Sequence, residues 1–444
     1  MSKIAKRIPG LILAAAMLFS ITACGGSTAG SDNSTVSDSK AGSSEASVQK
    51  EPVTLSLWHI WAADSESSKA PFEKVLADFQ TANPDIKLKV DATENETYKT
   101  KIRAAVAANE APDIFFYWSG GYMKSFVDAG KLLPLNDYLD DETRSRQLTG
   151  TLSNMTFDGK IYGLAHSMSV GTFFINKELF AQNNVKIPET YEDLTAAVKA
   201  FRGKGITPMA VGAKDTWCID MYLDILETRQ AGYDACYKAL TKTGSFEDPD
   251  IIEGARKLQE LIDMGAFTDG AQGVTRDESE VPFYEGKIPM YFNGSWTIGN
   301  IMRPDSKIKD KIQIIKFPKL SDKSDINDFT GGVSEIFVVN ANTKFKDESV
   351  KAIKYISENF AKEVYLAGAG LPTWKVSVDE SKIDPLTKEL VKLTQDSKTY
   401  TLWWNTLLEG DDSQLYMNKS AELFAKRITP EQFVKDLQTM NTKK

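Results

Sequence analysis

The chain has 444 residues, of which 42% are hydrophobic and 26% charged, and its formal net charge is −8. These values are ordinary for a folded protein, and the length suggests two or three domains. The acidic balance argues against a nucleic-acid partner, because phosphates attract clustered Lys and Arg. Three cysteines exclude a disulfide scaffold. Two histidines without Cys-x-x-Cys or His-Glu-x-x-His spacing exclude a histidine-rich zinc site, and we expect no metal or cofactor.

The N-terminus combines a basic start with a short apolar run. Lys3, Lys6 and Arg7 precede the apolar residues 11–21. This run is too short to cross a hydrocarbon core, which needs about 20 residues. We therefore predict a signal peptide over residues 1–23. The stretch ITAC, ending at Cys24, resembles a bacterial lipobox, in which the cysteine becomes the first residue of the mature chain and receives lipid. The alternative is an ordinary signal peptide in which Cys24 has no role.

Residues 24–52 read as a lipidated cysteine followed by a flexible linker. Residues 25–50 hold eight serines, and Val36 and Val48 are the only large apolar side chains among them. Such a composition cannot offset the entropy of ordering and behaves as a tether. The residues before Cys24 contribute three positive charges and no negative one, so the mature chain would carry −11. We expect a protein anchored by lipid to the extracytoplasmic face of the cell membrane, with no other membrane-spanning stretch.

From residue 53 onward, strand and helix patterns alternate. Strands are predicted at 53–60, 86–90 and 113–118, and helices at 69–83, 97–110 and 120–130. Asp158-Gly159 predicts a tight hairpin. A strand at 172–176 and helices at 177–185 and 189–205 follow, then a strand at 206–213 and helices at 219–230 and 250–264.

The last third continues in the same way. We predict a strand at 288–292, a helix from Trp296, a strand at 333–340 and a helix at 347–360. Thr429 caps a C-terminal helix that has Pro430 in its first turn. No internal repeat is present. The alternation predicts an α/β fold of two lobes, each a mostly parallel sheet flanked by helices.

Tryptophans gather at the predicted strand ends. In an open α/β sheet, ligands bind at the carboxyl ends of the strands. Of eight tryptophans, five lie within a few residues of such an end: Trp58, Trp61, Trp118, Trp217 and Trp296. An indole face stacks on the C–H face of a pyranose ring, and its N–H remains free to donate a hydrogen bond. The cluster therefore indicates a sugar-binding site, although any single one of these rings could instead belong to the core.

Polar side chains near the same edges supply partners for sugar hydroxyls. They are Asp64, Glu94, Ser119, His166 and Asp220. Each also has a simpler explanation. A loop carboxylate can cap a helix or be solvated, and His166 can be a packed loop residue. Trp403 and Trp404 fall in a predicted helix, where we expect at least one of them in the core.

Several segments resemble one family. They are YKTKIRAAVAANEAPDIFFYW (98–118), AGKLLPL (129–135), GTFFINKELF (171–180), YEGKIPMYFNGSWTIGNI (284–301), FTGGVSEIFVVN (329–340) and GLPTW (370–374). Together with the lipobox they resemble the extracellular solute-binding lipoproteins of bacterial ABC importers, in the branch that takes up sugars and oligosaccharides (family 1). The GK-x-P-M-x-x-N-G-S-W segment is the most specific piece. The resemblance runs from about residue 53 to the C-terminus.

This resemblance implies a two-lobed periplasmic-binding-protein-like fold of type II, with a hinge and an interlobe cleft. The first lobe would hold residues 53–168 and 328–370, and the second 169–327 and 371–444. Trp58 and Trp118 would line the cleft from the first lobe, and Trp296 from the second. Gly332 and Trp374, in the FTGG and GLPTW segments, complete the candidate set.

The implied function is capture of an oligosaccharide and its delivery to an ABC transporter permease by a monomeric lipoprotein that is not an enzyme. A surface glycoside hydrolase is the first rival, but it needs a pair of carboxylates about 5–5.5 Å or about 6.5–9.5 Å apart, and the sequence marks no such pair. The second rival is a binding protein for a polyamine, a quaternary amine or a peptide. The sequence does not name the sugar. We expect Cys218 and Cys236 to be free buried thiols, with a disulfide between them as the alternative.

Overall fold

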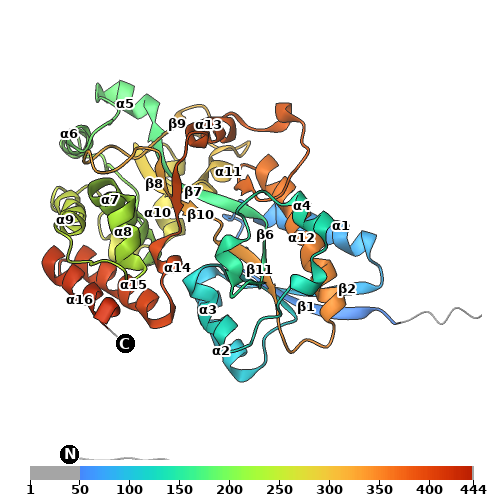
Figure 1. Cartoon of the computed structure of the whole chain (residues 1–444). Helices are drawn as coiled ribbons and strands as arrows, with labels where there is room; N and C mark the ends of the chain where they lie inside the picture. Colours follow the sequence, from blue (N-terminus) through green and yellow to red (C-terminus); the bar gives the residue numbers. More distant parts are fainter. Residues whose placement is uncertain (1–50, 443–444) are drawn as a thin grey trace, which may run out of the picture. The chain divides into compact units, whose positions relative to one another are not determined.

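The structure is a computed structural model that describes residues 51–442. The predicted signal peptide, Cys24 and the linker up to residue 50 lie outside the described residues. The described chain forms two α/β lobes, each built around one main sheet (Figure 1).

The first sheet has five strands in the order β2-β1-β3-β11-β6. Their bounds are β1 Val53–His59, β2 Ile86–Ala92, β3 Ile114–Trp118, β6 Leu164–Ala165 and β11 Glu335–Val339. β1 pairs in parallel with β2 and β3, whereas β11 is antiparallel to β3 and β6. The helices of this lobe include α1 Lys69–Ala82, α2 Asn95–Ala108, α3 Gly121–Asp128, α4 Asp141–Arg146 and α12 Lys346–Leu366. α12 packs on both β11 and α1, and this closes one core of fully buried aromatic and aliphatic side chains.

The second sheet is organised around one long strand, β7 (Ser167–Asn176). β8 Met290–Gly294, β9 Ile312–Ile315, β10 Asp328–Gly332 and β12 Leu371–Pro372 all pair with it in antiparallel fashion. β13 Thr399–Thr401 joins β10 in parallel. The α/β class and the two lobes are confirmed, but the expectation of a mostly parallel sheet in each lobe is wrong. In the first sheet half of the pairings are antiparallel. In the second sheet nearly all pairings are antiparallel, because β8, β9, β10 and β12 each run in the direction opposite to β7.

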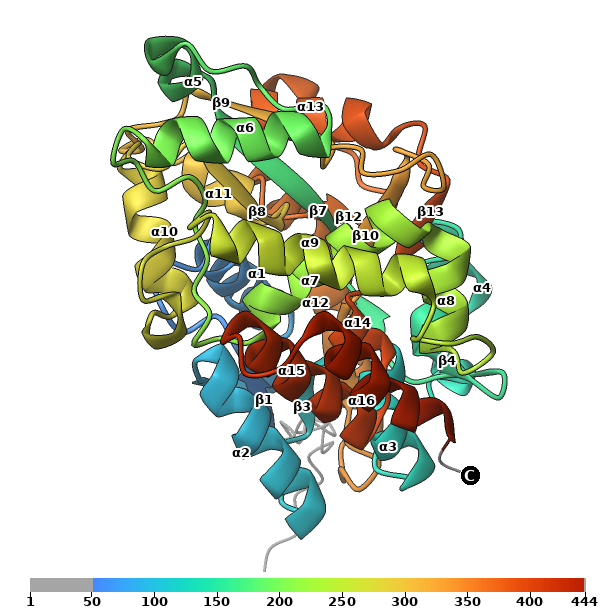
Figure 2. The ribbon, with the colours of Figure 1, turned by 90° about the vertical axis from the view of Figure 1, so that its left-hand side faces the viewer.

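A buried helix fills the centre of the second lobe. α7 (Trp217–Ala231) is buried along almost its whole length. It packs against α9 (Pro249–Asp263) and α15 (Gly410–Phe424), and Figure 2 shows α9, α15 and the C-terminal α16 (Pro430–Thr442) on the outer side of the lobe. A helix covered on all sides needs no polar face. The remaining helices of the lobe are α5 Lys177–Asn183, α6 Tyr191–Arg202, α8 Tyr233–Leu240, α10 Arg276–Tyr284, α11 Thr297–Ile301, α13 Pro385–Thr394 and α14 Trp404–Leu407.

Local sequence signals explain many of the element ends. Asp158 and Gly159 adopt φ values of 49° and 75° and join β4 Thr156–Phe157 to β5 Lys160–Ile161, which confirms the predicted hairpin. Thr190 and Asp193 form a capping box at the start of α6. The short 3₁₀ helices are Asn136–Tyr138, Ser153–Met155, Ala271–Gly273 and Glu380–Lys382.

Two further expectations have clear outcomes. The strand predicted at 206–213 is absent, and Met209 makes only isolated bridges to Phe267 and Met290. Pro208 has no N–H for a strand ladder, and Gly212 lies so close to Thr275 that a side chain at position 212 would clash with the Thr275 backbone.

Cys218 and Cys236 are free and buried, as predicted. Among the described helices, none has both the length and the apolar character needed to cross a membrane.

Candidate functional site

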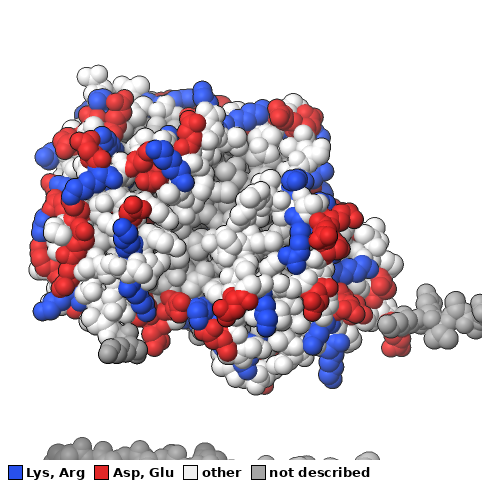
Figure 3. Space-filling model, in the orientation of Figure 1, with Lys and Arg blue, Asp and Glu red and all other residues white. Residues whose placement is uncertain are grey.

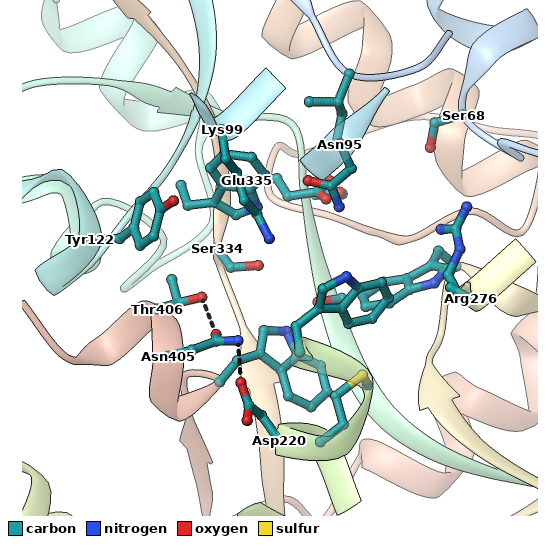
Figure 4. A pocket seen from close by; sticks show the side chains of 18 of the residues that line it. Ser68, Asn95, Lys99, Tyr122, Asp220, Arg276, Ser334, Glu335, Asn405 and Thr406 are labelled. Carbon is teal, nitrogen blue, oxygen red and sulfur yellow. Dashed lines mark hydrogen bonds between the residues drawn. The ribbon is translucent and has the colours of Figure 1, made fainter. Parts of the chain in front are cut away.

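A cavity lies where the two lobes meet, and both contribute to its wall. The space not filled by atoms, including the part open to solvent, is about 1020 Å³, at the upper end of typical ligand pockets. Figure 4 shows Lys99, Asn95 and Tyr122 of the first lobe facing Asp220, Asn405 and Arg276 of the second. The segments that run between the lobes also line it, through Ser167, Ser169, Ser334, Glu335 and Ala369.

Five tryptophans line this cavity: Trp61, Trp118, Trp217, Trp296 and Trp403. Trp296 is central among those of the second lobe, because its ring centroid lies 6.2 Å from that of Trp217 and 6.2 Å from that of Trp403. Trp118 enters from the carboxyl end of β3 and packs edge-on against Phe116 at 5.0 Å. The cavity therefore carries large apolar ring faces from both lobes.

Gly294 holds the Trp296 ring in place. A Cβ on Gly294 would lie 2.1, 2.2 and 2.3 Å from three atoms of that ring. The indole therefore lies directly over the glycine backbone at the end of β8. The N-G-S-W segment thus requires glycine at this position, because any side chain there would displace the ring.

Several polar atoms at the cavity are buried without a partner. Among the described residues that line it, Asn95 Oδ1, Ser169 Oγ, Asp220 Oδ1 and Trp296 Nε1 have no hydrogen-bond partner. Leaving a buried polar group unpaired costs about 1–3 kcal/mol. These atoms include acceptors, a hydroxyl and an N–H donor, so the wall offers a mixed set of hydrogen bonds to a ligand.

Burial raises the pKa of the carboxyl groups at the cavity, so near neutral pH they are protonated far more often than exposed carboxyl groups. Burial raises the pKa of Asp220 to about 7, and Asn405 Nδ2 donates to its Oδ2 at 3.0 Å. Burial, together with the nearby Glu66, raises the pKa of Glu335 to about 7. Burial and the neighbouring Asp220 also raise the pKa of Asp224 well above its ordinary value. Protonated carboxyl groups can donate as well as accept, so they suit uncharged hydroxyl partners.

The two cations of the wall are already paired. Lys99 Nζ lies 2.6 Å from Glu96 Oε1 and 5.5 Å from the centroid of the Trp118 ring. Arg276 Nη2 donates to Glu66 Oε1 at 2.8 Å. The charges of the site are therefore balanced within the protein. In the part of the chain that the structure describes, no group of three or more His, Cys, Asp or Glu side chains could hold a metal ion.

The structure brings four of the predicted site residues to the cavity wall: Trp118, Trp217, Asp220 and Trp296. Glu94 instead caps α2, accepting from the backbone N–H groups of Glu96 and Thr97. Asp64 has a 96% exposed side chain and pairs with Lys69.

The other predicted residues lie behind the wall or away from it. Ser119 is buried, and its hydroxyl donates to Val333 O at 2.7 Å. His166 stacks on Phe360 at 4.3 Å, and burial lowers its pKa to about 3.

Trp58 lies under Lys101, whose Nζ is 4.3 Å from the ring centroid. Gly332 has φ 119° in β10 and pairs with Ser169 of β7. Trp374 is 1% exposed in the first core and donates to Ala165 O at 2.8 Å. None of these three is among the residues that line the cavity.

Sequence reasoning missed much of the polar wall. It did not select Asn95, Lys99, Arg276, Glu335 or Asn405. Asn95 and Lys99 lie in the first turns of the helix that follows the strand predicted at 86–90, so their place near a strand end could have marked them as site residues. Arg276 begins α10, and the Thr275-x-x-Glu278 capping box marks that helix start in the sequence, but no strand signal placed the helix at the cavity.

Comparison with known proteins agrees with this geometry. The family model for bacterial extracellular solute-binding proteins matches residues 62–362, more than half of the chain. The chain belongs to that family. It is 26% identical to the multiple sugar-binding protein of Streptococcus mutans over 82% of this chain and 86% of that protein.

Solved structures of similar proteins share the fold over nearly their whole length. One, from work on xylan utilization by Caldanaerobius polysaccharolyticus, is 39% identical with a TM-score of 0.85, covering 87% of this chain and 100% of that one. A chitin oligosaccharide binding protein is 29% identical with a TM-score of 0.81, covering 88% and 98%. The solute-binding protein thus has relatives that are binding proteins rather than enzymes.

Gly294→Ala tests whether the packing of the Trp296 ring over Gly294 is needed for ligand binding. The added methyl group should displace the indole and lower ligand affinity by about tenfold or more, which is at least about 1.4 kcal/mol. Isothermal titration calorimetry would measure the affinity, with urea unfolding to confirm that the variant is folded. Gly273→Ala is the matched control, because a Cβ there would meet nothing within 4 Å. Equal affinity in wild type and Gly294→Ala would contradict the assignment.

Asp220→Asn tests the buried carboxyl. The folded-state pKa of Asp220, about 7, lies above the unfolded value of about 4. Protonation therefore favours the folded state, and this group makes the free energy of unfolding fall as pH rises from about 4 to about 7, then level off. The variant should lose that slope, about 1.4 kcal/mol per pH unit.

The measurement is urea unfolding of wild type and Asp220→Asn across that pH range. Asp322→Asn serves as control, since that side chain is 97% exposed. Parallel stability profiles for wild type and Asp220→Asn would show that Asp220 is not protonated on folding.

Proposed function

We propose that this solute-binding protein captures a neutral oligosaccharide in the interlobe cavity and delivers it to the permease of an ABC importer. The observation that carries the proposal is the cavity wall, where tryptophan rings from both lobes lie beside buried polar atoms that lack partners. Ring faces stack on pyranose rings, and the unpaired groups take up hydroxyls.

The charge balance of the wall supports a neutral ligand. Lys99 and Arg276 are paired within the protein, and the pKa values of Asp220 and Glu335 are raised to about 7. A cationic ligand such as a polyamine would need ionised carboxylates facing it. An anionic ligand would have to displace Glu96 or Glu66 from its cation. Sugar hydroxyls need neither change.

A fragment of xylan is the first candidate sugar. The 39% identical structure comes from work on xylan utilization, and the 29% identical one binds chitin oligosaccharide. Xylan and chitin are both linear polysaccharides, so a chain of flat rings fits several tryptophan platforms. The protein's role is binding without catalysis.

We propose that the lobes move about three crossing segments. These are the β6–β7 junction, the β10–β11 turn and the segment from α12 to β12. β10 pairs with β7 and β13 of the second sheet, which favours a crossing between β10 and β11. The lobe limits predicted at residues 168, 328 and 371 stay a prediction. Closure about such a hinge would exclude water from the bound sugar.

We also propose that Cys24 carries lipid and that the mature protein is a monomer tethered to the outer face of the membrane. The basic start, the apolar run and the ITAC stretch support this. Tethering would raise the concentration of the protein beside its permease without adding contacts to it. Stable anchoring needs more than one acyl chain, because a single chain binds only marginally.

Titration with sugars tests the binding function. Intrinsic tryptophan fluorescence of the chain lacking residues 1–24 should shift saturably with xylo-oligosaccharides at about micromolar concentration. Chito-, malto- and raffinose-type sugars and spermidine complete the panel. Trp296→Ala should lower the affinity for the best sugar by about tenfold or more. Saturation by spermidine alone, with no response to any sugar, would overturn the sugar assignment.

Cell fractionation tests the anchor. The full-length protein should sediment with membranes, and mass spectrometry of its N-terminal peptide should show lipid on Cys24. Cys24→Ala should lose both the modification and the cleavage before residue 24. A wild-type protein found in the soluble fraction, or a mature N-terminus elsewhere, would contradict the lipid anchor.

A further inference from the structure

The loop of residues 62–68 separates the binding cavity from a second, larger cavity. The second cavity is lined mainly by α1, the C-terminal end of α11, the end of α12 and the start of α13, and holds about 2150 Å³ when its open part is included. Glu66 and Ser67 line both cavities. The loop is therefore the wall between them.

An ion pair across the lobes holds this wall in place. Arg276 of the second lobe donates from Nη2 to Glu66 Oε1 at 2.8 Å. The two side chains are only 13% and 18% exposed. Next to them, Ser65 Oγ donates to Asp277 Oδ2 at 2.8 Å. Partial burial strengthens such a pair relative to one on the open surface.

The neighbouring loop residues also bond to the second lobe. Ser67 Oγ donates to Trp296 O at 3.0 Å, and Asn300 Nδ2 donates to Ser65 O at 2.8 Å. Arg303 donates to the Asp64 carbonyl. Asp64, Ser65 and Ser67 thus each contact the segment that carries Trp296, and Glu66 between them contacts Arg276 at the start of α10. The loop crosses the cleft as a strap, and Glu66 is its side chain at the binding cavity.

At the opposite end of the binding cavity the backbones of the two lobes come close together. Figure 4 shows Tyr122 and Thr406 on the side away from Arg276. There the first lobe meets the second at Gly121, where a Cβ would lie 2.2 Å from Leu407 O. At the Glu66 end, by contrast, side chains of the loop of residues 62–68 bond across to the second lobe.

We propose that Glu66 and Arg276 form a gate that sets the length of the oligosaccharide. This inference rests on the proposed function and names the residues that limit its ligand. A sugar chain lying on the tryptophans would end against the ion pair. A longer chain would have to break the pair to reach the second cavity. The protein therefore selects short oligosaccharides, and the second cavity receives further sugar units only when the gate is open.

Affinity measured against chain length tests the gate. Calorimetry would use β-1,4-xylo-oligosaccharides from the disaccharide to the hexasaccharide. For wild type, affinity should stop rising at a short member of the series and fall for the longest. Glu66→Ala should raise the affinity for the hexasaccharide, relative to the best short sugar, by about tenfold or more. Glu66→Asp, which keeps the charge but shortens the side chain, should give a smaller change in the same direction and carries the test if Glu66→Ala does not fold.

Glu73→Ala is the matched control. Glu73 lines the second cavity from α1, and among the described residues it makes no hydrogen bond across the lobes. The Glu73→Ala substitution removes a carboxylate near the same loop and should leave the dependence of affinity on sugar chain length unchanged. An unaltered profile in both Glu66 variants would overturn the gate while leaving sugar binding intact. Failure of wild type to bind any member, with spermidine alone bound, would instead overturn the proposed function.

Discussion

Strand β7 runs for ten residues from the first lobe into the middle of the second sheet, and four other strands pair with it. Its first residues, Ser167 and Ser169, line the cavity, whereas Phe173 and Ile175 are buried in the second core. One strand therefore fixes the position of the site relative to both cores. β8, paired along β7, then delivers Gly294 and Trp296 to the cavity. A shift in this register by one residue would turn the aromatic side chains of β7 to the other face.

The two lobes limit the net charge of the site by different means. In the first lobe, Lys99 is neutralised by Glu96. In the second, Asp220 and Asp224 lie one turn apart on a buried helix, where burial holds their pKa values high. Two ionised carboxylates at that spacing would repel each other in a medium of low dielectric constant. On the outer surface the situation is reversed. Figure 3 shows Lys, Arg, Asp and Glu intermixed around the margins of this face, while its hollowed middle carries uncharged residues.

The sequence predicted what depends on near neighbours. The Thr429 cap, the Asp158-Gly159 hairpin and the strand that carries Trp118 are set by residues only a few positions apart, and all three are present. Trp118 ends β3, Trp296 follows β8, and both line the cavity, whereas Trp58 does not line it and no strand directly precedes Trp217. What escaped prediction depends on long-range pairing. No short stretch of sequence indicates the antiparallel order around β7. Glu94 could be a helix cap or a ligand contact, and only its bonds to backbone N–H groups decide between the two. Arg276 is held at the cavity by distant partners, because its backbone N–H donates to Asp215 and its guanidinium donates to Glu66, 210 positions away.

The two lobes contact each other through different interactions at the two ends of the cavity. At Gly121 the lobes approach through backbone atoms, and packing of that kind is insensitive to salt and to pH. At Glu66 closure depends on an ion pair and on hydroxyl hydrogen bonds, whose strength varies with hydration and with the ligand beside them. In the proposed complex, a sugar on Trp296 would exclude water from the neighbouring pair and so strengthen it. Ligand and strap would then stabilise the same arrangement, and each would favour the other by the same free energy. The backbone end supplies a fixed contact, while the Glu66 end responds to whether the ligand fits.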